Sequence, residues 1–132
     1  TNAVIGGHVR IGDGAILGGN CAVHQFVRIG RKALIGGMTG VDRDVIPFGI
    51  VTCERGKLRG LNVIGLKRSG YDEGVVKSIT KAFMFIFKGK EGTFEDRLAQ
   101  AHEKFKDNEM VMEQVKFIDE ALQGRRKIMV AE

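Results

Sequence analysis

The feature that most constrains the fold of this chain is an aliphatic residue that recurs every six positions. Ile, Leu or Val occupies positions 5, 11, 17, 23, 29, 35 and 41. The residue after most of them is glycine, and the residue four positions later is always small. An α-helix repeats every 3.6 residues and a strand every two, so a period of six indicates a repeat architecture instead.

Each six-residue unit is expected to form one short strand and one turn, with the aliphatic side chain inward and glycine supplying the turn angles. Three units would close a triangular coil of roughly 18 residues, and coils would stack at about 4.8 Å. The sequence therefore predicts a parallel β-helix over residues 1–46. Only about two and a half coils fit, so we expect earlier repeats or other chains to cover the exposed faces.

The repeat fades after Val41, and residues 47–70 are expected to form an exit turn, strands and a connecting loop. Pro47, the only proline, excludes a central strand at its position. The segment Ile50–Cys53 is expected to pair as a strand.

Residues 71–123 change to a helical period and predict a domain of three helices. Each helix begins after a residue whose side chain can accept a hydrogen bond from the first turn, namely Asp72, Thr93 (with Asp96) and Asn108. The tail, residues 124–132, is expected to be loosely held. The predicted fold class is therefore mixed β and α, a parallel β-helix followed by a C-terminal helical appendage.

The composition excludes several classes of function. A net charge of +5 favours acidic partners. The basic residues are dispersed, with no Trp and one Tyr, so no nucleic acid is expected. No apolar run approaches the roughly 20 residues that span a bilayer, so no membrane span is expected. Two cysteines, Cys21 and Cys53, do not make a disulfide framework, which favours a reduced, cytoplasmic location.

Two of the three histidines lie in the repeat. His8 and His24 are 16 residues apart, which is expected to place both on one outer face of neighbouring coils. Together with Gln25 they form a candidate pocket for proton transfer or sugar binding. The alternative is that both imidazoles are merely solvated. A catalytic zinc needs three convergent ligands, which the repeat lacks, so no metal site is predicted.

The segment from Asn62 to Gly70 is basic and bounded by glycine. Arg68 and Asn62 are candidates to hold a diphosphate, because a guanidinium makes fork-like contacts with phosphate oxygens. The alternative is a solvated linker without a ligand.

Four motifs are specific in this order and spacing: Gly6-Gly7-His8-Val9, Gly19-Asn20-Cys21-Ala22-Val23-His24-Gln25-Phe26, Ile35-Gly36-Gly37 and Gly65-Leu66-Lys67-Arg68-Ser69-Gly70. Followed by three helices, they resemble the C-terminal half of the UDP-N-acetylglucosamine O-acyltransferase family of lipid A biosynthesis. The resemblance covers the chain up to Leu122. It also implies a left-handed β-helix, although the usual crossover rule favours the right hand.

This resemblance implies an acyltransferase. The family moves an (R)-3-hydroxyacyl group from acyl carrier protein to the 3-hydroxyl of UDP-N-acetylglucosamine, as a homotrimer with sites between subunits. It implies no cofactor, because the acyl donor is the carrier protein thioester.

The resemblance also implies roles for individual residues. The backbone N–H of Gly7 would stabilise the thioester oxyanion, and His8 would position the substrate. His24 and Gln25 would contact the nucleotide sugar. Asn62 and Arg68 would hold that sugar from the neighbouring chain. Gly37 would lie where the size of the side chain limits the length of the acyl chain.

The sequence departs from the family pattern in two ways. The general-base histidine of the family belongs to a repeat before Thr1, so this polypeptide alone is expected to be inactive or barely active. Ile64 and Ser69 replace polar and basic residues that are common beside the nucleotide. Two alternatives stay open: the related N-acyltransferase of the same pathway, and a non-catalytic trimerisation module.

Overall fold

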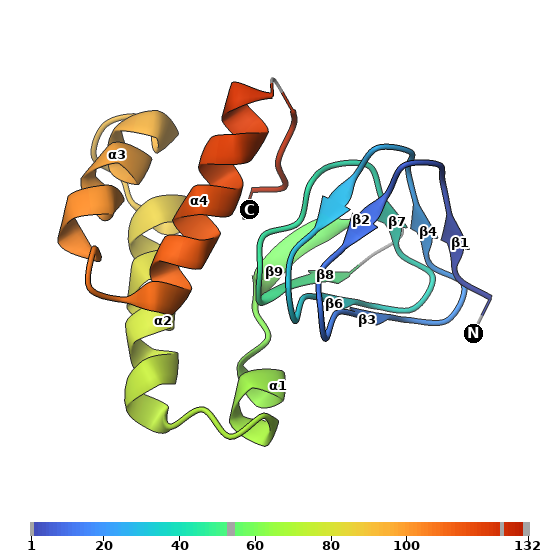
Figure 1. Cartoon of the computed structure of the whole chain (residues 1–132), viewed down its shortest axis with the longest axis horizontal. Helices are drawn as coiled ribbons and strands as arrows, with labels where there is room; N and C mark the ends of the chain where they lie inside the picture. Colours follow the sequence, from blue (N-terminus) through green and yellow to red (C-terminus); the bar gives the residue numbers. More distant parts are fainter. Residues whose placement is uncertain (1, 53–54, 125, 131–132) are drawn as a thin grey trace.

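The computed structural model describes residues 2–52, 55–124 and 126–130, and it joins a β-helix to a group of helices (Figure 1). Seven two-residue strands come first: β1 (Val4–Ile5), β2 (Arg10–Ile11), β3 (Ile16–Leu17), β4 (Ala22–Val23), β5 (Arg28–Ile29), β6 (Leu34–Ile35) and β7 (Gly40–Val41). Two longer strands follow, β8 (Gly49–Thr52) and β9 (Lys57–Leu61).

The strands form three walls of a prism. One wall has the order β1-β4-β7, the second β2-β5 and the third β3-β6-β8-β9, and all pairs are parallel except β8 with β9. The aliphatic residues of the middle coil fill the interior, and Val23, Ile29 and Ile35 are buried. The predicted parallel β-helix with an 18-residue coil is confirmed, since Val23 pairs with Val41.

Glycine has a different role in the coil from the one predicted. A Cβ atom on Gly6 would lie 2.6 Å from the backbone nitrogen of Gln25 in the next coil, so glycine is needed for close stacking of backbones. The positive φ angles of the turns occur instead at the third residue after each repeated aliphatic residue. They lie between 57° and 65° at His8, Asn20, Phe26, Lys32 and Met38.

The third coil is two residues shorter than the others. Ile29 pairs with Val45 and Leu34 with Ile50, an offset of 16 residues, so the turn after β7 is contracted. The β-helix was predicted to end at residue 46. Parallel pairing continues beyond this point, because β8 pairs with β6. Cys53, the expected end of this strand, lies outside the described residues, and the division of the chain into domains stays a prediction.

One end of the prism lies beyond the third coil and is called the lower end here; the other, formed by the first coil, is called the upper end. Segments from elsewhere in the chain close the lower end. Gly56 donates to the Gly40 oxygen under the first wall (2.7 Å). The Asp44 nitrogen donates to Lys127 (3.0 Å) and the Met129 nitrogen to Asp44 (2.8 Å) under the second. Ile128 and Met129 are buried. The expectation of a loosely held tail is wrong for residues 126–130, because they pair with an open backbone edge and cover the core beneath it.

Four helices follow the strands: α1 (Val63–Arg68), α2 (Glu73–Lys88), α3 (Phe94–Lys104) and α4 (Glu109–Gln123). The capping roles of Asp72, Thr93 and Asn108 are confirmed, and Thr93 forms a complete capping box with Asp96. Helix α1 replaces the predicted connecting loop. Its six residues are too few to show a helical period in the sequence.

The helices pack on the β-helix through α2 and α4, with α3 on the far side (Figure 1). The Arg31 guanidinium donates to both carboxylate oxygens of Glu113 on α4, at 2.8 and 3.0 Å. The hydrogen bond to Glu113, with a smaller contribution from Tyr71, raises the pKa of Arg31 above its ordinary value. Gln114 is buried and donates to the Pro47 oxygen (2.9 Å). In the described part of the chain, no helix has the length and apolarity to cross a membrane.

Candidate active site

The candidate site surrounds one corner of the prism, where the wall of β1, β4 and β7 turns into the wall of β2 and β5. Gly7 and His8 form this corner in the first coil, and Gln25 and Phe26 form it in the second. The Phe26 nitrogen donates to the Gly7 oxygen (3.0 Å), which holds the two corners in register. The N–H of Gly7 has no hydrogen-bond partner among the described residues, and a Cβ at Gly7 would meet nothing within 4 Å.

His8 and His24 occupy different places at this corner. His8 is the second residue of the turn and lines a hollow of about 640 Å³ with Phe26, Arg28 and Glu120. His24 lies before the turn and lines a different hollow of about 690 Å³. The prediction of a shared face is therefore wrong. His24 directly follows its strand, at an offset of one from the aliphatic residue, whereas His8 lies in the turn at an offset of three, so the chain changes direction between the two positions.

The two hollows differ in their walls. The hollow beside His24 is lined by Val23, Val41 and Met129 and also by charged residues, including Arg43 and Lys57. The hollow beside His8 runs between the second wall and α4, and it is more polar. Gln25 belongs to neither. It is exposed and lines a shallower hollow with Phe26, Asp44 and Arg126, where the third coil is contracted.

Asn62 and Arg68 bound helix α1. Asn62 is buried, and its Oδ1 accepts a hydrogen bond from the Gly65 nitrogen (3.0 Å), so it caps the helix. Arg68 is exposed in the last turn and has no hydrogen bond or ion pair with any residue that the structure describes. Neither residue lines the hollows of His8 or His24 in the same chain.

Gly37 lies at a different corner, between the third wall and the first. It is exposed, and the nearest atom to a Cβ at this position would be the Gly19 oxygen, at 3.3 Å. The neighbouring Met38 is 73% exposed. A side chain at position 37 would therefore project outward, and its Cβ would press on the Gly19 carbonyl, which would have to shift by a small amount.

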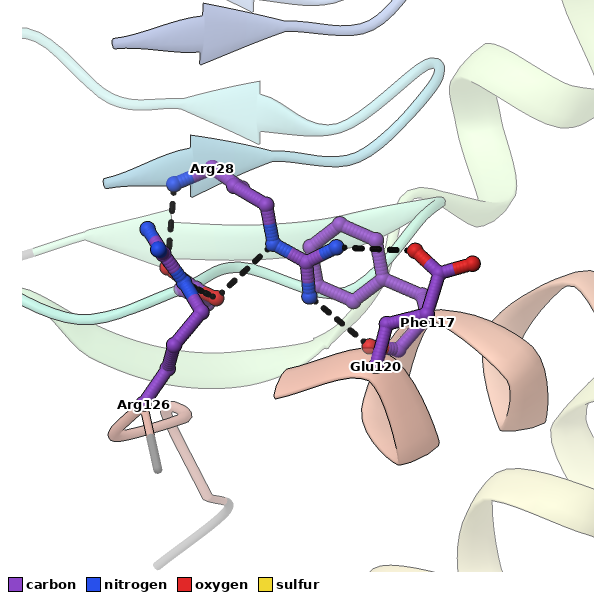
Figure 2. Close-up of polar contacts among 5 residues, drawn as sticks. Arg28, Phe117, Glu120 and Arg126 are labelled. Carbon is purple, nitrogen blue, oxygen red and sulfur yellow. Dashed lines mark hydrogen bonds and ion pairs between the residues drawn. The ribbon is translucent and has the colours of Figure 1, made fainter. Parts of the chain in front are cut away.

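The sequence did not reveal a partly buried ionic cluster, centred on Asp44, beside the His8 hollow (Figure 2). The side chain of Asp44 is only 3% exposed and accepts from Arg28 Nε (3.1 Å) and Arg126 Nε (2.8 Å). Arg28 also donates to Glu120 (3.0 Å) and to the Phe117 oxygen (2.9 Å), and its guanidinium carbon lies 4.3 Å from the Phe117 ring centroid. The cluster ties the second wall to α4 and the tail.

These partners are between 16 and 92 residues apart in the chain, so no local pattern signals them. The one available signal was the alternation of charges at Asp42-Arg43-Asp44, which resembles an ordinary turn. No group of three metal-binding side chains occurs within residues 2–52, 55–124 and 126–130.

The coils and the helical appendage together define a hexapeptide-repeat β-helix protein with a C-terminal helical domain. A family model described as "Udp N-acetylglucosamine O-acyltransferase; Domain 2" matches residues 44–129. The chain belongs to the UDP-N-acetylglucosamine O-acyltransferase family.

Two similar sequences carry the name acyl-[acyl-carrier-protein]–UDP-N-acetylglucosamine O-acyltransferase. The relative from Rhizobium rhizogenes is 43% identical over 112 residues, which are 85% of this chain and 41% of that protein. The relative from Sinorhizobium fredii is 40% identical over 117 residues, 89% of this chain and 43% of that protein. The chain thus spans less than half the length of these relatives.

Solved structures support the same fold. The UDP-N-acetylglucosamine acyltransferase of Arabidopsis superposes with a TM-score of 0.93 at 32% identity, covering 98% of this chain and 47% of that one. The enzyme of the same name from Francisella novicida gives a TM-score of 0.86 at 28% identity, covering 100% and 47%. The left-handed winding implied by the sequence resemblance is confirmed by this likeness.

Proposed function

We propose that this chain carries part of the donor and acceptor sites of an acyltransferase. The reaction transfers a 3-hydroxyacyl group from acyl carrier protein to the 3-hydroxyl of UDP-N-acetylglucosamine, in lipid A biosynthesis. The observation that carries the proposal is the open corner at Gly7 and His8, found in a chain 43% identical to a relative named for this reaction. The relatives named here are O-acyltransferases, which disfavours the N-acyltransferase alternative.

In the proposed reaction, the sugar oxygen attacks the thioester carbonyl and the carbonyl oxygen becomes an oxyanion. The unpaired N–H of Gly7 donates to that oxyanion, a contribution that can reach several kcal/mol in a site that excludes water. The absence of a Cβ at Gly7 lets the carbonyl oxygen approach the backbone closely. The proton of the sugar hydroxyl passes to a general base, for which no residue of this chain is assigned, and the carrier thiol leaves.

The side chains near the corner would position the acceptor. His8 directly follows Gly7 in the chain and is proposed to orient the substrate, while His24 and Gln25 are proposed to contact the nucleotide sugar. Because Asn62 and Arg68 line neither hollow in their own chain, the proposal places them against the substrate of a neighbouring subunit. Arg68 has an unused guanidinium for the diphosphate, and the cap leaves the two Nδ2 hydrogens of Asn62 as donors.

A homotrimer and a cytoplasmic location are parts of the same proposal. A second candidate function is a non-catalytic trimerisation module. Apolar side chains exposed at the upper end of the prism favour it, with Val4 at 67% and Ile16 at 55% exposure. Such surfaces often mark protein interfaces.

The two candidates differ in ligand dependence. We expect light scattering to report a trimer, and UDP-N-acetylglucosamine to raise its thermal unfolding midpoint, since a ligand that binds only the folded state stabilises it. Arg68→Ala should lower that ligand-dependent rise. Lys67→Ala is the matched control, because Lys67 is an exposed cation in the same helical turn. A trimer with no response to the ligand would support the trimerisation module instead.

A further inference from the structure

Phe26 combines two features that are unfavourable for a phenylalanine. Its side chain is 53% exposed, and its backbone has a φ of 65°. A bulky residue rarely adopts the left-handed region, where asparagine and glycine are tolerated far better. An exposed aromatic ring also keeps apolar surface in water. Neither feature stabilises the folded chain, so the ring needs another explanation.

Other corners meet the same backbone requirement with several residue types, and His8, Lys32 and Met38 also have a positive φ. Asn20 has a φ of 58° and is a residue type suited to it. Phe48 has a φ of 67° but is fully buried, so its ring contributes to the core. Phe26 has neither the tolerant side chain of Asn20 nor the burial of Phe48.

The ring of Phe26 lies against the imidazole of His8. The two residues occupy the same corner in successive coils, and their ring centroids are 5.1 Å apart with planes only 5° from parallel. The hydrogen bond from the Phe26 nitrogen to the Gly7 oxygen keeps the corners aligned. A parallel contact covers one face of the imidazole and leaves both ring nitrogens at the uncovered edge, where they can donate or accept hydrogen bonds.

We infer that Phe26 is a positioning residue that holds the His8 imidazole by its face. Rotation of the imidazole about its Cβ–Cγ bond would break the stack, so the ring plane is fixed before substrate arrives. This inference rests on the proposed function in so far as His8 meets the substrate. It accounts for an exposed aromatic residue in a strained conformation, because such a residue is kept for function at the expense of stability.

The substitution Phe26→Asn separates positioning from stability. It removes the stack and places a residue tolerant of positive φ at the corner, so the unfolding midpoint should be equal to or higher than that of the unchanged chain. Phe26→Tyr keeps the ring and should retain the stack. Met38→Asn is the matched control, because Met38 has a φ of 58° and is 73% exposed, at another corner.

The direct readout is the NMR spectrum of the histidine rings in the whole chain, which has three histidines. In Phe26→Asn, the ring protons of His8 should move downfield as the shielding by the stacked ring is lost, while those of His24 and His102 stay in place. Phe26→Tyr and Met38→Asn should leave all three unchanged. An unmoved His8 signal in Phe26→Asn overturns the inference. A clearly lower unfolding midpoint also overturns it, since Phe26 would then be a stability residue.

Titration with UDP-N-acetylglucosamine tests the functional consequence. A lost aromatic contact corresponds to a roughly 2- to 10-fold weaker affinity in Phe26→Asn, and Phe26→Tyr should restore the affinity. Unchanged affinity despite a moved His8 signal overturns the positioning role. If the unchanged chain itself, as a trimer, binds no UDP-N-acetylglucosamine, the proposed function fails, and the spectrum still decides whether Phe26 orients His8.

Discussion

The two ends of the β-helix are built from the same repeat, yet they differ in what covers them. At the lower end, a different segment pairs beneath each of two walls, and β8 and β9 extend the third. At the upper end, Ile5 and Ile11 occupy the same phase as Ile29 and Ile35 but are 46% and 40% exposed, against 2% and 0%. A six-residue period thus specifies the coil and the inward direction of a side chain, whereas burial depends on the next layer.

The largest effect is expected at the lower end, in the ionic cluster around Asp44. Asp44→Ala leaves the Arg28 and Arg126 guanidinium groups facing each other without their shared carboxylate. Removing one partner from a buried pair typically destabilises a protein by about 3–5 kcal/mol. Urea unfolding monitored by circular dichroism measures the change.

The control for this substitution lies two residues away. The Asp42 side chain is 66% exposed, and its Oδ1 lies 4.0 Å from Arg43 Nε, at the limit of an ion pair. Asp42→Ala should change the free energy of unfolding by less than about 0.5 kcal/mol. Equal losses in the two variants would show that the cluster does not anchor α4 and the tail to the wall.

The second effect compares one residue type at both ends of one wall. Ile11 and Ile29 are partners in the pairing of β2 with β5. Ile29→Ala should cost about 2–4 kcal/mol, because it opens a cavity in a filled interior. Ile11→Ala should cost only about 1 kcal/mol, because much of that side chain already meets solvent. The same unfolding experiment measures both, and equal losses would contradict the role assigned to the covering layer.

The parts of the fold that were predictable from sequence are those specified locally. The strand period and the helix caps at Asp72, Thr93 and Asn108 each depend on residues within a few positions of one another. The tail, the cluster at Asp44 and the contracted coil depend on pairings across large separations. They were missed because an isolated Asp or Ile does not indicate which distant edge it meets.

The candidate site shows the same division. The repeat predicted that His8 and His24 would stand outside the coil, and both are exposed. It did not predict that His8 lies in the turn and His24 before it, or that Phe26 packs on His8, because both depend on the backbone conformation of the corner. The motif containing Gln25 and Phe26 supported the resemblance without indicating what the phenylalanine does.

A third experiment changes the upper end itself. Duplicating the 18 residues 5–22 ahead of the original copy adds one coil of the chain's own sequence above β1, β2 and β3. The original Ile11 then becomes an interior residue, and the cost of its replacement by Ala should rise by about 2 kcal/mol, toward that of Ile29→Ala. The added copy of Ile11 serves as the internal control and should be as tolerant as the original is now. No change in the cost at the original position would show that exposure at this end has a cause other than the missing layer.

The smallest effect on stability is expected at the corner of Gly37. There the question is how much space the exposed corner leaves for a side chain and for the acyl chain. Gly37→Met should lower the free energy of unfolding by no more than about 1 kcal/mol, because the added side chain projects from an exposed corner and only its Cβ presses on the Gly19 oxygen. It should weaken binding of 3-hydroxyacyl-UDP-N-acetylglucosamine with long acyl chains more than with short ones. Displacing two buried methylenes costs about 1.6 kcal/mol, or roughly 15-fold in affinity. Calorimetry with a series of chain lengths measures this preference, and Gly37→Ala should give an intermediate shift. An unchanged preference in both variants would remove Gly37 from the acyl-binding surface, because a methionine in contact with the chain end cannot leave its length unrestricted.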